Sequence, residues 1–145
     1  MTRITPWLLS IVLLAGCSVS PGLIGPLPTV SDKDNAAEII VIRESRVSGS
    51  LQTFPVTLDG VRIYGLQVGE YAVMTVTPGD HIVGTQYPNI PVGWEDVNVS
   101  VRVEPRRSYY FRIDPAVGQL LVNPITPEDG RTLMSKTKRI SQPPE

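Results

Sequence analysis

The chain has 145 residues, of which 41% are apolar and 19% are charged. Its 13 Lys and Arg against 14 Asp and Glu give a net charge of −1, which argues against the strongly basic surface of a nucleic-acid-binding protein. One Cys and one His exclude an intrachain disulfide and a zinc site built from several such ligands. The 14 Pro and 12 Gly argue against a helical bundle. We therefore expect a single folded domain that holds no metal or cofactor.

Residues 1–16 show the order of features that is typical of a secretory signal peptide. Arg3 supplies a positive charge, an apolar run extends from Trp7 to Ala15, and the small residue Gly16 follows. This run is much shorter than the roughly twenty apolar residues that a transmembrane helix needs. We therefore predict a signal peptide, with a buried N-terminal helix as the alternative.

Leu14-Ala15-Gly16-Cys17 resembles the lipobox of bacterial lipoproteins at every position. The resemblance implies that Cys17 carries the lipid anchor and becomes the first residue of the mature chain. Ser18 follows, whereas Asp in this place is the usual signal for inner-membrane retention in enterobacterial lipoproteins. The resemblance thus implies an outer-membrane protein, anchored on the periplasmic face. Two or more acyl chains would hold it firmly, because each buried CH₂ contributes about 0.8 kcal/mol.

The composition divides the rest of the chain into a spacer and a folded domain. Residues 17–35 contain Pro21, Pro26 and Pro28 together with glycines and a polar stretch, and this composition predicts a flexible tether after the lipidated cysteine. The folded domain is predicted to extend over residues 36–145.

The domain is predicted to consist of short strands. Glu38–Ile42 is a β-branched run typical of a strand buried on both faces. Residues 97–104 alternate valine with polar side chains, which predicts a strand with one face buried. Asp59-Gly60 predicts a two-residue hairpin turn. The remaining predicted strands are 54–58, 61–64, 71–77, one starting near 82, 109–114 and 119–122.

A short helix is predicted after the last strand. Thr126 is a suitable cap, Pro127 fits the first turn, and two acidic residues follow at the positive end of the helix dipole. Gly130 inside this helix is unfavourable by about 1 kcal/mol relative to Ala. Roughly seven or eight short strands with little helix predict an all-β fold, an antiparallel β-sandwich with a short C-terminal helix.

The order of several motifs resembles a bacterial lipoprotein family known as domain of unknown function 2846. The shared features are an opening strand that ends in Arg, an Asp-Gly hairpin, a Gly-x-Tyr element, a Pro-Gly-x-His turn and an aromatic strand. They correspond here to Ile40–Arg43, Val56–Gly60, Gly69–Tyr71, Thr77–His81 and Tyr109–Arg112. The chain is also distantly similar to the PEGA group of surface β-domains. Neither resemblance implies catalytic residues.

His81 is the only residue around which a hydrolase triad could be built. It follows Asp80 at a predicted turn, and the chain has no Gly-x-Ser-x-Gly nucleophile motif. We therefore interpret His81 as a turn residue that bonds to nearby backbone, and we expect a protein without catalytic residues.

Residues 87–94 form an aromatic, proline-rich connection between two strands. Tyr87 and Trp94 could form a recognition loop, because exposed aromatic residues on loops are frequent in binding surfaces. The alternative, which we favour, is that they fold back and cap the core, because aromatic side chains bury a large apolar area.

These patterns together predict a non-enzymatic envelope protein, attached to the membrane through Cys17, that recognises an envelope protein partner. Recognition would use an edge strand or the loop rim. The alternative is a module that binds cell-wall glycan or a small ligand. An aromatic-lined cleft that includes Trp94 or Tyr110 would favour this alternative.

Overall fold

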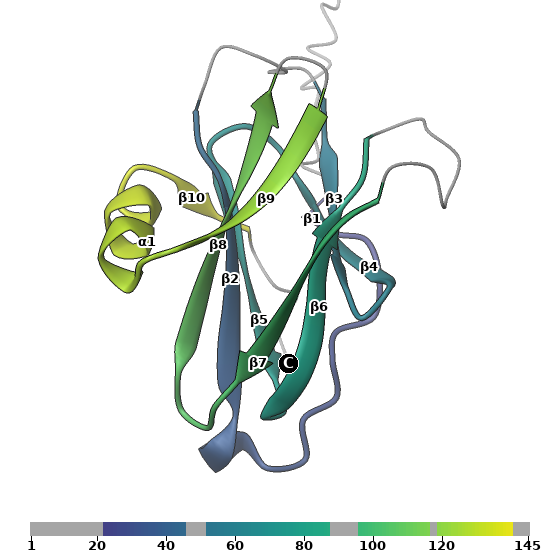
Figure 1. Ribbon diagram of the computed structural model, residues 1–145, viewed down its shortest axis with the longest axis vertical. Helices are drawn as coiled ribbons and strands as arrows, with labels where there is room; N and C mark the ends of the chain where they lie inside the picture. Colours follow the sequence, from purple (N-terminus) through teal and green to yellow (C-terminus); the bar gives the residue numbers. More distant parts are fainter. Residues whose placement is uncertain (1–21, 46–51, 88–95, 117–118, 141–145) are drawn as a thin grey trace, which may run out of the picture.

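The computed structural model describes residues 22–45, 52–87, 96–116 and 119–140 (Figure 1). The described residues form two five-stranded sheets and one short helix. The all-β sandwich with a short C-terminal helix, predicted from the sequence, is confirmed. The predicted signal peptide of residues 1–16 and the predicted lipid attachment at Cys17 lie outside the described residues.

The strands of each sheet run in a fixed spatial order. In the first sheet the order is β1 (Gly22–Leu23), β4 (Val61–Leu66), β3 (Phe54–Leu58), β6 (Gly79–Thr85) and β7 (Val97–Val103). In the second sheet it is β10 (Lys138–Arg139), β5 (Glu70–Val76), β2 (Ala37–Arg43), β8 (Ser108–Ala116) and β9 (Gln119–Ile125).

Strand direction differs between the two sheets. Every pair in the first sheet is antiparallel, as predicted. The second sheet is mixed, because β2 is parallel to β8 and β10 is parallel to β5. The strands of each parallel pair are far apart in the sequence, and the chain passes through the other sheet between them. No short hairpin connects them, so their relative direction need not be antiparallel.

β2 is the central strand of the second sheet and is buried on both faces, as its β-branched sequence predicts. Ile39 and Val41 point into the main core between the sheets. Ile40 and Ile42 point the other way, into a smaller core that also contains Val73. The helix α1 (Pro127–Met134) lies against this outer face (Figure 1) and contributes Leu133 and Met134 to the smaller core.

Arg43 ends β2 inside the protein, where its side chain is only 1% exposed. Its guanidinium carbon lies 4.1 Å from the centre of the Phe54 ring, and Nη1 donates to the carbonyl oxygens of Leu66, at 2.8 Å, and Gln52. Burial lowers the pKa of Arg43 to about 10, against the opposing effect of the Glu70 charge, so the group stays protonated at neutral pH. Arg43 thus ties the second sheet to backbone of the first.

The predicted tether of residues 17–35 requires a correction, because both ends of the segment 22–35 are bonded to the sandwich. β1 pairs with β4, and the N–H of Ile24 donates to the carbonyl of Ile63 at 2.8 Å. A Cβ on Gly25 would lie 1.9 Å from the carbonyl oxygen of Arg62, so only glycine permits this approach. A glycine that by composition indicated a flexible spacer is required here for close packing.

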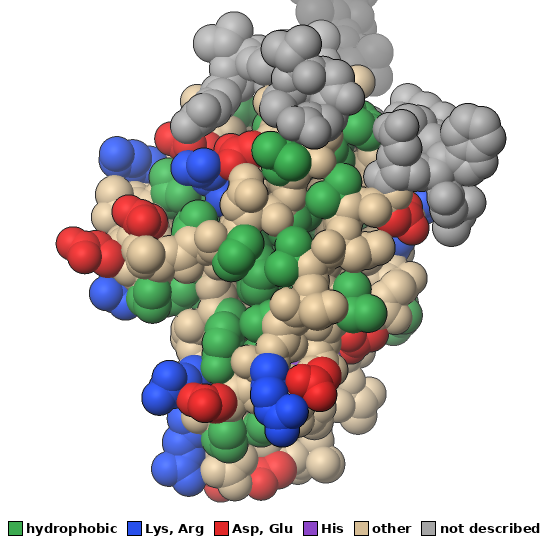
Figure 2. Space-filling model, viewed as in Figure 1, with side chains coloured by type: hydrophobic (Ala, Val, Ile, Leu, Met, Phe, Trp, Pro, Cys, Tyr) green, Lys and Arg blue, Asp and Glu red, His purple; other side chains and the backbone are tan. Residues whose placement is uncertain are grey.

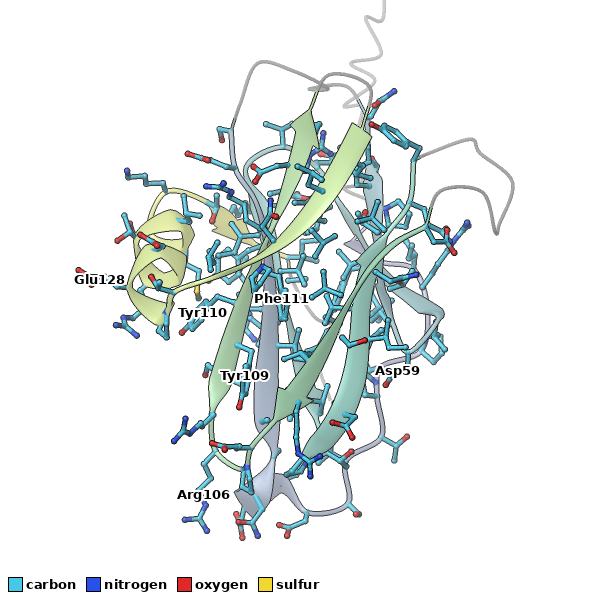
Figure 3. The ribbon with its side chains drawn as sticks, in the orientation of Figure 1. Asp59, Arg106, Tyr109, Tyr110, Phe111 and Glu128 are labelled. Atoms are coloured by element: carbon cyan, nitrogen blue, oxygen red, sulfur yellow. The ribbon has the colours of Figure 1, made fainter. Side chains whose placement is uncertain are left out.

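The far end of this segment is also fixed to the domain. Residues 33–35 form a turn of 3₁₀ helix capped by the Asp32 side chain. Arg106, labelled at the lower end of Figure 3, bonds to the carbonyl of Asp34 at 3.2 Å and to the Asn35 side chain at 3.0 Å. The folded domain therefore begins no later than Gly22.

Gly130 is buried under the ring of Tyr110, although a glycine inside a helix is intrinsically unfavourable. A Cβ at this position would lie 2.2 Å from Cδ1 of Tyr110 and 2.9 Å from its Cβ. The close contact between α1 and β8 therefore depends on the missing side chain.

The Gly130→Ala variant is expected to lower the free energy of unfolding by about 1–3 kcal/mol, because the extra methyl overpacks this contact. Intrinsic helix propensity alone would give the opposite sign, a gain of about 1 kcal/mol. Urea unfolding measures the change. Thr132→Ala, at an exposed position of the same helix, is the control and should not destabilise. A Gly130→Ala variant that is as stable as this control would contradict the packing argument.

Candidate interaction site: the β7 edge and its groove

The two sheets have four edge strands, and three of them are poorly suited to pair with another chain. β1 and β10 are only two residues long. β9 contains Pro124, which has no N–H to donate. β7 has seven residues, contains no proline, and pairs with β6 over its whole length without a register shift. Short strands, prolines and bulges are devices that protect sheet edges, and β7 is the outermost strand of the described structure that has none of these three.

The direction of the β7 backbone groups follows from the neighbouring strand. The N–H of Asp59 donates to the carbonyl of Ile82, and the N–H of Ile82 donates to Oδ1 of Asp59, each at 2.8 Å. The backbone of Ile82 therefore points toward β3, and that of Val83 points toward β7, where it faces Val99. This direction alternates from residue to residue along an antiparallel pair. The backbone groups of Val99 therefore point toward β6, and those of Ser100 point the opposite way, in the plane of the sheet and beyond its edge.

The same alternation turns the backbone groups of Asn98 and Arg102 outward. The side chains of Asn98, Ser100 and Arg102 are exposed on the outer face of the first sheet. Val97, Val99 and Val101 point toward the core but are only partly buried. The predicted alternation of this strand is confirmed, but its apolar face is incompletely covered.

A groove of about 580 Å³ lies beside these valines, between β7 and the second sheet. The groove lies beside the start of β8, which β9 does not cover. The last residue of β9, Ile125, pairs with Tyr110, and the chain then leaves the sheet and enters α1. Apolar side chains gather at the centre of this face of the molecule (Figure 2). The apolar and aromatic residues that line the groove are Val99, Val101, Tyr109, Tyr110, Phe111, Pro124, Ile125 and Pro127.

Three consecutive aromatic residues of β8 have different positions around the groove (Figure 3). Phe111 is buried in the main core. Tyr109 is partly buried, and its hydroxyl accepts the N–H of Glu104 at 2.9 Å. Tyr110 lies on the opposite face of β8, packed against Gly130 of α1. The groove therefore has an aromatic wall that other contacts already hold in place.

The charged side chains that line the groove are both positive, in a chain whose net charge is −1. Arg107 forms an ion pair with Glu104, with Nε 2.9 Å from Oε2. Arg131 of α1 also lines the groove. With Ser108 also in the lining, the groove combines an apolar floor with a polar and basic rim.

His81 lies within β6, and both of its ring nitrogens face acceptors. Nδ1 is 2.8 Å from Oδ2 of Asp59, and Nε2 is 2.8 Å from the carbonyl oxygen of Thr77. Neither acceptor can supply a proton, so both contacts are hydrogen bonds when the imidazole is doubly protonated. The bond to Thr77 is the nearby backbone contact expected from the sequence.

The electrostatic surroundings of His81 favour the charged form. Partial burial alone would lower its pKa, but the bonds to Thr77 and Asp59 and the negative charges of Asp59 and Asp80 outweigh this effect. The pKa of His81 is therefore raised above its ordinary value. A protonated imidazole with both nitrogens engaged is poorly suited to act as a general base. Among the described residues, no group of three or more His, Cys, Asp or Glu is arranged to hold a metal ion.

Tyr87, which the sequence offered as part of a recognition loop, packs edge-on against Phe54, with ring centres 6.2 Å apart. This is a contact that a core cap would make. Trp94 lies outside the described residues, as does Cys17, so their roles stay predictions.

Sequence reasoning did not find the groove or the burial of Arg43. The edge position of β7 depends on the order of strands in the sheet, which the alternation of 97–104 does not contain. Tyr110 is a groove residue that the sequence suggested, as part of a possible aromatic cleft. An Arg directly after an uninterrupted β-branched run was the available sign that Arg43 is buried.

Comparison of the chain with protein-family models, with curated proteins and with solved structures gives no match.

The raised pKa of His81 predicts a pH-dependent contribution to stability. A group whose pKa is higher in the folded state stabilises fully below its unfolded pKa of about 6.5, and this contribution is lost as pH rises through the folded pKa. His81→Gln should therefore cost the most stability near pH 5, and the difference from the parent chain should shrink as the pH is raised toward 8. Urea unfolding across this range measures it.

Asp59→Asn is the matched control, since Asn keeps an oxygen for the Ile82 N–H and tolerates the positive φ of 51° at this turn position. It removes the negative charge beside His81 and should reduce the pH dependence. A stability difference that does not vary with pH would contradict the assignment.

Proposed function

We propose that this protein is a lipid-anchored, non-catalytic component of the bacterial cell envelope that binds a protein partner along the β7 edge. The lipobox-like sequence that ends in Cys17 supports the anchor, and Ser18 supports placement on the periplasmic face of the outer membrane. No helix among the residues that the structure describes is both long and apolar enough to cross a bilayer.

The observation that carries the binding proposal is the unprotected β7 edge beside the groove. A partner strand can accept and donate bonds to the outward backbone groups of β7, which gives affinity. Its inward side chains can enter the apolar groove beside Val99 and Val101, which gives specificity. A regular edge of seven described residues that contains no proline and no bulge is costly to leave exposed, because it invites aggregation.

A second candidate function is binding of cell-wall glycan or a small ligand in the groove itself. The observation that favours it is the aromatic wall with Tyr109 and Tyr110, flanked by Arg107 and Arg131. Concave sites with aromatic walls and a few polar groups are typical of ligand binding. This function would use the groove and would not require the backbone of β7.

The lipid anchor can be tested with cells grown in labelled palmitate. The parent chain should incorporate label and fractionate with the outer membrane, whereas Cys17→Ser should lose both the label and the membrane association, because two or more acyl chains provide most of the binding energy. Ser18→Ala is the control and should keep the label. A parent chain that takes up no label and stays in the soluble extract would contradict the anchor.

The edge can be tested with Ser100→Pro, since the outward N–H of Ser100 is not needed for pairing with β6. In vivo crosslinking, followed by mass spectrometry of the membrane fraction, should show about a tenfold or greater loss of the specific protein adduct, because each lost backbone bond contributes about 1 kcal/mol and the ring blocks strand approach.

Ser100→Ala keeps the N–H and should retain the adduct, and urea unfolding of both variants checks that the fold survives. If Ser100→Pro leaves capture unchanged while Arg131→Ala abolishes binding to glycan fragments, the second candidate function replaces the first.

A further inference from the structure

We propose that the partner of the β7 edge is a second copy of this chain, joined by antiparallel pairing of two β7 strands about a two-fold axis. This inference rests on the proposed function, since it requires β7 to be the binding edge. It adds the identity of the partner and the register of the pair. Two-fold symmetry is the commonest arrangement in homo-oligomers, and it requires a surface that is complementary to itself.

The geometry of β7 restricts the possible registers. Pairing about a two-fold axis perpendicular to the sheet keeps the inner face of one copy beside the inner face of the other. Residues that meet must then belong to the same face. The outward backbone groups of Asn98, Ser100 and Arg102 must take part in the hydrogen-bonded pairs. An axis at any residue of β7 satisfies these conditions, and the registers compared below are those centred on Asn98, Val99, Ser100 and Val101, in the middle part of the strand.

Charge selects among these registers. When the axis passes through Val99, Asp96 faces Arg102 of the second copy, and by symmetry Arg102 faces the second Asp96. Asn98 then faces Ser100, so that polar side chains meet on the outer face. On the inner face, Val97 meets Val101 and Val99 meets its own copy. Opposite charges and β-branched side chains in directly facing positions are favourable cross-strand pairs.

The neighbouring registers lack this complementarity. With the axis at Ser100, Asp96 faces Glu104 of the second copy, which places two carboxylates opposite each other. With the axis at Val101, Arg102 faces Ser100 and Glu104 faces Asn98, so that neither charge has an opposite charge facing it. With the axis at Asn98, Asp96 faces Ser100. The register centred on Val99 is therefore favoured, because like charges in facing positions are destabilising.

The existing partner of Arg102 is easily exchanged. Its Nη1 lies 3.6 Å from Oδ2 of Asp80, and the two side chains are 80% and 78% exposed. Such an exposed ion pair contributes little to stability, so Arg102 can turn toward Asp96 of a second copy at small cost. Pairing also covers Val97, Val99 and Val101, which the single chain leaves partly exposed.

Cysteine pairing in the full-length chain, expressed in cells, tests both the dimer and its register. Val99→Cys should form a disulfide-linked dimer, because residues at the axis of a pair without backbone bonds have Cα atoms about 4.5 Å apart, within the range for a disulfide. Val101→Cys is the matched control on the same face. In this register each copy's residue 101 faces residue 97 of the other copy, so Val101→Cys alone should form no dimer. Co-expressed Val101→Cys and Val97→Cys chains should link.

Charge reversal then tests the ion pairs in the Val99→Cys background. Asp96→Arg or Arg102→Asp alone should slow disulfide formation several-fold, because each makes two like-charged contacts across the axis. The double variant should restore the rate. Asp80→Ala, which removes the present neighbour of Arg102, should not slow it.

The outcomes separate this inference from the proposed function. If Val99→Cys forms no dimer while Ser100→Pro still abolishes capture of a different protein, the edge binds another partner and the self-pairing is wrong. If Val101→Cys alone forms the dimer, or if the double charge variant stays slow, the register is wrong. If Val99→Cys forms no dimer and Ser100→Pro changes nothing, both the inference and the use of the edge are overturned.

Discussion

An open β-sandwich must deal with the backbone N–H and C=O groups at the edges of its sheets, because these groups can pair with any strand that approaches. Among the four outermost strands that the structure describes, β1 and β10 are only two residues long and β9 contains Pro124, and these features limit pairing with another chain. β7 is the exception. The same strand borders the groove, so the place where backbone bonds are available is also the place where apolar surface is incompletely covered. This coincidence is the physical basis of the functional proposals.

Polar contacts in the interior connect the two sheets to each other. Arg43 carries a buried positive charge from the second sheet to carbonyl oxygens of the first, and the Phe54 ring covers its other face. Removing one partner of such a contact usually costs more than the contact contributes, because the remaining polar groups lose their hydration without compensation. His81 has a comparable position at the surface, where it joins the turn at Asp59 to the strand that begins after Thr77.

The sequence predicted individual strands better than their neighbours. The burial of Ile39–Ile42, the hairpin at Asp59-Gly60, the alternation of 97–104 and the cap at Thr126 were predicted correctly, because each depends on residues within a few positions of one another, although Glu38 at the start of the first run is exposed. The tether was wrong for residues 22–35, because the contact between Gly25 and β4 joins segments that are far apart in the sequence. The candidate site was predicted only as a general possibility of edge or cleft binding. Its residues could not be named, since strand order decides which strand lies at an edge.

The sequence by itself determined the fold class, the absence of Cys-rich or His-rich metal chemistry, and the prediction of an anchor at Cys17, because composition, periodicity and short motifs are local properties. Only the tertiary structure decided that β2 is central and β7 peripheral, that Gly130 must remain glycine beneath Tyr110, and that β9 ends early enough to leave a groove beside β8. These features arise where two distant segments compete for the same space. The energy of such contacts depends on both partners at once, so neither segment specifies them alone.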